Sequence, residues 1–222
     1  MRWQAVMTGF AVVASVTAAV GAPVTIDRAA VRFDAPETGG IARPQFIFER
    51  ELAFEARLEA LGDPDFNQGD AYLDRHVRAA LERHVAEELL AQLAMDPEPR
   101  PEDVARRAQA ALGVLEQRVG GRERLAKAAS AEGVDASEID RLVRREARAS
   151  LYLDRMIAPM LEPSEAELRE VHRSTANPFR GQKFDDVTAA LRKWYVGERL
   201  EAALAAFYQN ARGRVHIVVL PP

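Results

Sequence analysis

The feature that most constrains the fold is a strand pattern near each end of the chain, with only helical patterns between the two. Residues 24–33 (VTIDRAAVRF) alternate in part and are rich in β-branched side chains, and residues 214–220 (RVHIVVL) do the same before Pro221. A strand that has no partner is unstable in water. We therefore expect the two segments to pair in one small sheet, which would place the two ends of the mature chain together.

The chain between these segments predicts a mainly helical body. Its 222 residues are 48% hydrophobic and 29% charged, which is typical of a globular chain long enough to bury a core. Residues 41–48 predict a short strand that runs into a helix, and Pro101 suits the first position of a later helix. The stretches with helical spacing are 46–61, 72–95, 104–119 and 122–132. The predicted fold class is mainly α with a small β-sheet (α+β).

Residues 135–161 predict the helix on which the body is built. Asp135 and Glu138 have the spacing of a capping box, and Pro159 must end or kink the helix because it has no N–H to donate. Glu146 falls within the apolar stripe, so we expect a salt bridge to an arginine on a neighbouring element. The arginines at 141, 144, 145 and 148 lie mainly off the stripe.

The last third of the chain predicts two further helices. Ser164 and Glu167 form a second capping box, which opens a helix to about Ser174. A loop over 175–183 leads to a long helix from Phe184 whose apolar positions change face near Gly197. Such a helix packs first on one partner and then on another.

The N-terminus predicts export from the cytoplasm. Residues 1–22 combine Arg2 with a short apolar run and small residues near Gly21 and Ala22, which is typical of a cleaved signal peptide; a retained anchor is the alternative. The chain has no cysteine, which is compatible with an oxidising compartment such as the periplasm. The net charge of -4 gives no basic field for nucleic acid, and after cleavage we expect no stable membrane insertion.

No stretch predicts an enzyme, a metal site or a cofactor. His76 and His84 lie eight residues apart on one helix, whereas zinc-binding pairs on a helix prefer four. His84 and Glu88 have that spacing, but we interpret them as a surface or half-buried pair. No nucleotide-binding or nucleophile motif occurs in the chain.

The order of these elements resembles the core domain of the SurA-like periplasmic chaperones. The segments that carry the likeness are AYLDRHVRAALERHVAEELLAQLA, GGRERLAKAASAEGVDASEIDRLVRREARASLYLDRMIAPMLEPSEAELREVH and the closing KFDDVTAALRKWYVGERLEAALAAFYQNARGRVHIVVL. The resemblance implies one chaperone core over 23–222, a multi-helix domain closed by its N- and C-terminal strands. It is a likeness of pattern and element order, because none of these segments is a catalytic signature.

The chain departs from this family at one place. Relatives insert parvulin isomerase domains where this chain has only residues 174–183, which are far too few for such a domain. The resemblance therefore implies an ATP-independent holdase without isomerase activity, whose partners are unfolded exported chains such as outer-membrane proteins. Two alternatives stay open: an exported adaptor or structural protein with one dedicated partner, and a degenerate peptidyl-prolyl isomerase.

A holdase needs exposed apolar side chains on rigid helices, and flexible methionines suit varied partners. Ordinary core is the alternative role for every such residue in this chain. Our candidates for the peptide-binding surface are Tyr152, Leu153, Met156, Met160, Trp194 and Tyr195.

Overall fold

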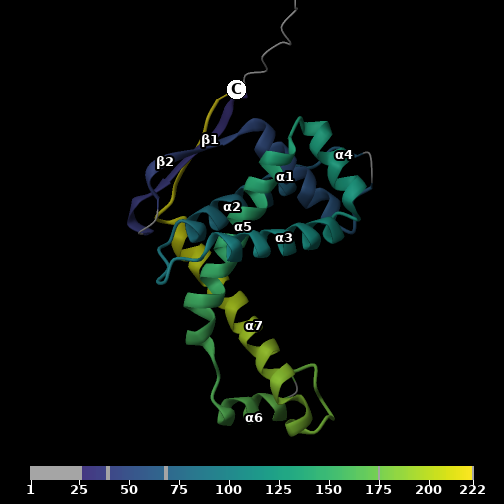
Figure 1. The fold of residues 1–222 in the computed structure, drawn as a ribbon, viewed down its shortest axis with the longest axis vertical. Helices are drawn as coiled ribbons and strands as arrows, with labels where there is room; N and C mark the ends of the chain where they lie inside the picture. Colours follow the sequence, from purple (N-terminus) through teal and green to yellow (C-terminus); the bar gives the residue numbers. More distant parts are fainter. Residues whose placement is uncertain (1–26, 39–40, 68–69, 175, 222) are drawn as a thin grey trace, which may run out of the picture.

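The computed structural model describes residues 27–38, 41–67, 70–174 and 176–221, which form a helical body and a long leg that extends from it (Figure 1). The body comprises the described residues up to 152 together with the C-terminal strand. The leg comprises the described residues from 153 to 212. The expected signal peptide, residues 1–22, lies outside the described residues. Among those that are described, no helix combines the length and the apolar content needed to cross a bilayer.

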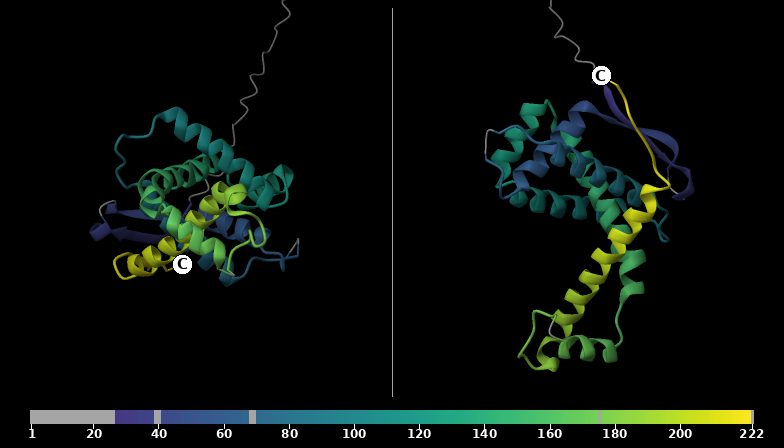
Figure 2. Two further views of the ribbon diagram at one scale, coloured as in Figure 1. Left: turned by 90° about the horizontal axis from the view of Figure 1, so that it is seen from below. Right: turned by 180° about the vertical axis from the view of Figure 1, so that it is seen from behind.

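The expected sheet between the two ends of the chain is confirmed. Strand β1 (Ala29–Ala35) lies at its centre, between β2 (Ile41–Phe48) and β3 (His216–Val219). Both neighbours are antiparallel to β1, and Phe33 lies opposite Ile217 in the pairing with β3. Figure 2 shows the long α7 helix turning at the body into β3, which then runs beside β1. Residues 24–26, where the strand pattern begins, lie outside the described residues.

The helices of the body bury apolar side chains in two larger clusters and in a small third one at the junction with the leg. One cluster covers the sheet, where Val31, Phe33 and Ile47 pack against Val85 and Leu89 of α2 (Asp74–Ala91). The other joins α1 (Glu49–Gly62), α3 (Pro101–Arg118) and α4 (Arg122–Glu132) to α5 (Ala136–Tyr152). Pro101 is the first residue of α3, as predicted. The helix predicted from 46 begins instead at Glu49, because residues 46–48 remain paired in the sheet.

Helix α5 begins where its sequence predicts, but it ends at Tyr152, earlier than the predicted end or kink at Pro159. The Asp135 carboxylate accepts hydrogen bonds from the backbone N–H groups of Ser137 and Glu138, and the Glu138 carboxylate accepts one from the N–H of Asp135. Beyond Tyr152 the chain passes through a π turn, η2 (Leu153–Ile157), and a 3₁₀ turn, η3 (Ala158–Leu161). Pro159 explains the break, since it cannot donate the next helical hydrogen bond and its ring clashes with the preceding turn.

The leg is an antiparallel arrangement of η2 and η3 with α7 (Phe184–Arg212), and α6 (Glu165–Arg173) lies across its tip (Figure 1). The second capping box is confirmed, because Ser164 and Glu167 bond to each other's backbone N–H at the start of α6. At the tip the Asn177 amide donates to the carbonyl groups of Val171, His172 and Ser174. These bonds close the short connection between α6 and α7.

Candidate functional site

Tyr152 and Leu153, the first two residues of the predicted surface, lie where the leg joins the body. Both are half-buried and pack against a small cluster that contains Leu90 and Ala91 of α2. Leu204 of α7 packs against the same cluster, so this junction holds together α2, the end of α5 and the upper part of α7. Tyr152 and Leu153 therefore contribute packing at the top of the leg and expose only part of their surface.

Met156 and Met160 lie lower on the leg and are exposed. Met156 in η2 exposes 36% of its surface and Met160 in η3 exposes 70%. Because the π turn and the 3₁₀ turn replace a continuous α-helix here, the apolar stripe of α5 does not continue against the body. The break at Pro159 thus leaves two flexible apolar side chains in contact with solvent.

The leg has two struts, which are η2 with η3 and the antiparallel helix α7. Trp194 and Tyr195 lie on α7. Their rings are neighbours, with centroids 6.4 Å apart, and both side chains are half-buried. A shallow hollow of 410 Å³ lies on α7 beside Trp194. Gly197 forms part of its floor and would have no atom within 4 Å of an added Cβ, so this side of the helix is open. The other residues around the hollow are Ala190, Lys193, Glu198 and Glu201.

The two struts that carry these residues are held together by specific contacts. The Arg192 guanidinium of α7 donates to the Glu162 carboxylate and to the carbonyl of Pro163, each at 3.1 Å. Leu153 and Leu204 pack in one cluster at the upper end. Five of the six predicted residues therefore lie on two adjoining segments of the leg, and Tyr152 lies at the end of α5, where the leg begins.

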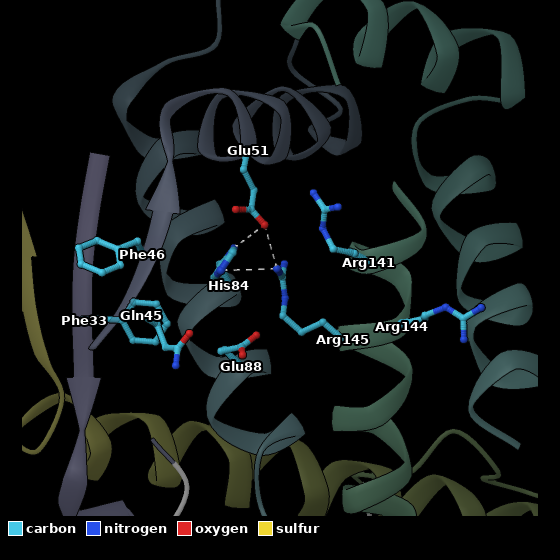
Figure 3. A pocket seen from close by; sticks show the side chains of 9 residues that line it. All are labelled: Phe33, Gln45, Phe46, Glu51, His84, Glu88, Arg141, Arg144 and Arg145. Atoms are coloured by element: carbon cyan, nitrogen blue, oxygen red, sulfur yellow. Dashed lines mark hydrogen bonds and ion pairs between the residues drawn. The ribbon is translucent and has the colours of Figure 1, made fainter. Parts of the chain in front are cut away.

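A second candidate site, in the body, is a cluster of ionised side chains around Arg145 (Figure 3). The Arg145 side chain is only 9% exposed, and its guanidinium lies 2.7 Å from Glu55, 3.2 Å from Glu87 and 3.4 Å from Glu51. His84 Nδ1 lies 2.9 Å from Glu55 Oε1. An ionised carboxylate can only accept, so the Nδ1 atom of His84 carries the proton in this contact.

The charges in this cluster determine the ionisation of its members. Burial opposes ionisation of Glu55, but the charge of Arg145 and the hydrogen bond from His84 outweigh it and lower the pKa of Glu55 to about 2. Burial raises the pKa of Glu87, although Arg145 is close to it. Burial also disfavours the charged form of Arg145, but Glu55 and Glu87 more than compensate and raise its pKa. Arg145 and Glu55 therefore stay charged and form a buried ion pair.

A hollow of 470 Å³ opens beside this cluster, between β2 and the helices α1, α2 and α5. Glu51, Glu55 and His84 place ligand atoms within 4.8 Å of one another, which is a spacing that a cation could use. The guanidinium of Arg145 already supplies the positive charge at that point, so the arrangement is a structural ion-pair cluster. The residues that line the hollow are Phe33, Gln45, Phe46, Glu51, His84, Glu88, Arg141, Arg144 and Arg145.

The charges that are buried in this cluster differ from those expected from the sequence. Arg145 was expected off the apolar stripe, but it lies three residues after Leu142 and four before Ala149, both of which are buried. That spacing was the signal that could have identified it. Glu146 is half-buried and interacts electrostatically with Arg118 of α3. The direct ion pairs of this cluster are those of Arg145 with Glu55 and Glu87. His84 bonds to Glu55 and is buried, so its interpretation as a surface or half-buried pair with Glu88 is wrong.

Comparisons of the chain with protein-family models, with curated proteins and with solved structures gave no match.

Proposed function

We propose that the chain is a SurA-like, ATP-independent holdase chaperone of the periplasm. It binds unfolded exported polypeptides, outer-membrane proteins among them, through the apolar side chains of the leg, and it has no isomerase activity. The observation that carries the proposal is the exposure of Met156 and Met160 on a leg that reaches away from the body.

The leg has the properties that such binding requires. An unfolded chain exposes apolar and aromatic side chains of varied shape, and methionine adapts to varied shapes because its thioether is flexible and polarizable. Trp194 and Tyr195 supply aromatic surface on the neighbouring strut, beside a hollow whose charged rim includes Lys193 and Glu198. The anchoring contacts at Leu204 and Arg192 hold both struts in place, which lowers the entropic cost of binding.

The experiment that tests the proposal measures aggregation. An outer-membrane β-barrel protein is diluted from urea into buffer with and without the mature chain, and light scattering is followed. We expect suppression at stoichiometric amounts without ATP. Replacing both methionines, Met156→Ser with Met160→Ser, should weaken the suppression roughly tenfold, because about 1.4 kcal/mol of apolar contact is lost.

The matched control is Val114→Ser, which removes an apolar side chain that is 61% exposed on α3 of the body. We expect this variant to suppress aggregation as the parent does. If the parent has no effect at stoichiometric amounts, the proposed function is wrong. If Val114→Ser and the double methionine variant weaken the suppression equally, the leg is not the binding surface.

A further inference from the structure

The two edges of the sheet are built differently. The outer edge of β2 carries Arg43 and Pro44, both exposed, and charged residues and proline are the usual means by which edge strands avoid pairing with other chains. The outer edge of β3 has neither. It consists of His216 and three β-branched residues that are 44%, 48% and 71% exposed: Ile217, Val218 and Val219. Among the described residues, no further strand pairs with it.

The hydrogen bonds to β1 define which backbone groups of β3 remain open. The N–H of Leu220 donates to the carbonyl of Ala30 at 2.9 Å. In an antiparallel pair the residues alternate between bonding to the partner and facing away from it. Val218, opposite Arg32, therefore bonds inward as Leu220 does. Ile217 and Val219 direct their N–H and carbonyl groups to the open side.

We propose that the open edge of β3 binds an extended, β-prone segment of an unfolded polypeptide as a fourth strand. This inference rests on the proposed function and specifies a mode of binding within it. Main-chain groups recognise any extended chain, and the exposed Ile217 and Val219 favour apolar side chains at alternate positions of the added strand.

The size of β3 favours such a segment over a second copy of the chain. Pairing of β3 with β3 of another copy joins only four residues from each side, whereas a stable dimer buries roughly 800 Å² per partner. An unfolded chain is long, and α7 leads from the leg directly into β3 (Figure 2). One polypeptide can therefore pair with β3 and contact the leg at the same time, and the two contacts reinforce each other.

The test uses a fluorescein-labelled, end-blocked peptide of alternating valine and threonine, with fluorescence anisotropy as the readout. Val219→Pro removes an outward N–H and leaves the bonds to β1 in place, whereas the matched control Val219→Thr keeps the N–H and changes only the side chain. We expect Val219→Pro to weaken binding roughly tenfold, and Val219→Thr to weaken it by clearly less because it loses one apolar contact but keeps the main-chain hydrogen bond. The same peptide, N-methylated at alternate residues so that one edge cannot donate, should also bind roughly tenfold more weakly.

The possible results separate this inference from the proposed function. Equal binding by the parent and Val219→Pro, or equal binding of the plain and the N-methylated peptides, overturns strand addition. The N-methylated peptide keeps the test valid if Val219→Pro fails to fold. A dimer in light scattering that Val219→Pro dissociates, with no peptide binding by the parent, would assign the edge to a second copy and overturn the proposal. Suppression of aggregation that Val219→Pro leaves unchanged would refute strand addition alone.

Discussion

Arg145 supplies the positive charge that compensates the buried carboxylates of the body. Its guanidinium compensates carboxylates from α1 and α2 in a site with little solvent. Replacing it, as Arg145→Leu, would leave Glu55 buried without its counter-ion, so we expect a loss of about 3–5 kcal/mol in the free energy of unfolding.

Urea unfolding followed by circular dichroism measures this loss. Arg144→Leu is the matched control, because Arg144 is exposed and, among the described residues, forms an ion pair with Asp140 of its own helix alone. We expect that control to lose less than about 0.5 kcal/mol. Equal losses in the two variants would show that the buried cluster does not stabilise the body.

The pH dependence of stability follows from Glu55. Its pKa is lowered to about 2 in the folded chain from an ordinary value of 4.5, so the folded state favours the charged form. The stability that this group contributes is therefore present above about pH 4.5 and is lost as the pH falls toward 2. We expect Glu55→Gln to be less stable than the parent at neutral pH and the gap to shrink below pH 4.5. Urea titrations at several pH values measure the gap, and a gap that stays constant with pH would contradict the assignment.

At the scale of the element, the start of α5 depends on its cap. The Asp135 side chain accepts from the backbone N–H of Ser137 at 2.7 Å and of Glu138 at 2.9 Å. Asp135→Ala should therefore cost about 1 kcal/mol of unfolding free energy. Asp140→Ala, which removes an exposed carboxylate from the same helix, should cost less than about 0.5 kcal/mol. Chemical denaturation of both variants checks the difference, which would vanish if the cap were not formed in solution.

The elements were predictable where the signal is local, as it is at the caps of α5 and α6 and at Pro159. The pairing of β1 with β3 was also predictable, since the strand pattern at the C-terminal end needs a partner and the other strand patterns lie near the N-terminal end. The partner of His84 was not predictable from the sequence, because Glu55 lies 29 residues away on another helix. Likewise, Met156 and Tyr152 had the same candidate role, although Met156 is exposed and Tyr152 packs at the junction of leg and body.

At the scale of the whole molecule, the sheet of the two chain ends closes the body. Truncation after Gly213 removes β3 and uncovers one edge of β1, which carries the buried Val31 and Phe33. Losing these cross-strand pairs and their hydrogen bonds should cost about 3 kcal/mol or more. Thermal and urea unfolding measure the cost. Removal of Pro221 and Pro222 alone is the control and should leave stability nearly unchanged, whereas equal stability of all three chains would show that β3 does not close the fold.

The proposed function assigns client binding to the leg rather than to the body. The body holds the buried ion pairs and the two larger apolar clusters, and Met156 and Met160 are exposed on the leg. Because the chain has no cysteine, a single one can be introduced at any position and labelled alone. Met160→Cys marks the leg, and Val114→Cys marks an equally apolar and exposed position on the body.

The most direct test of client binding by the leg couples benzophenone to each cysteine and adds a urea-diluted outer-membrane protein under ultraviolet light. We expect efficient crosslinking of the unfolded protein from position 160, little from position 114, and none from either position once that protein has folded. Equal crosslinking from both positions, or crosslinking from position 114 alone, would contradict client binding by the leg.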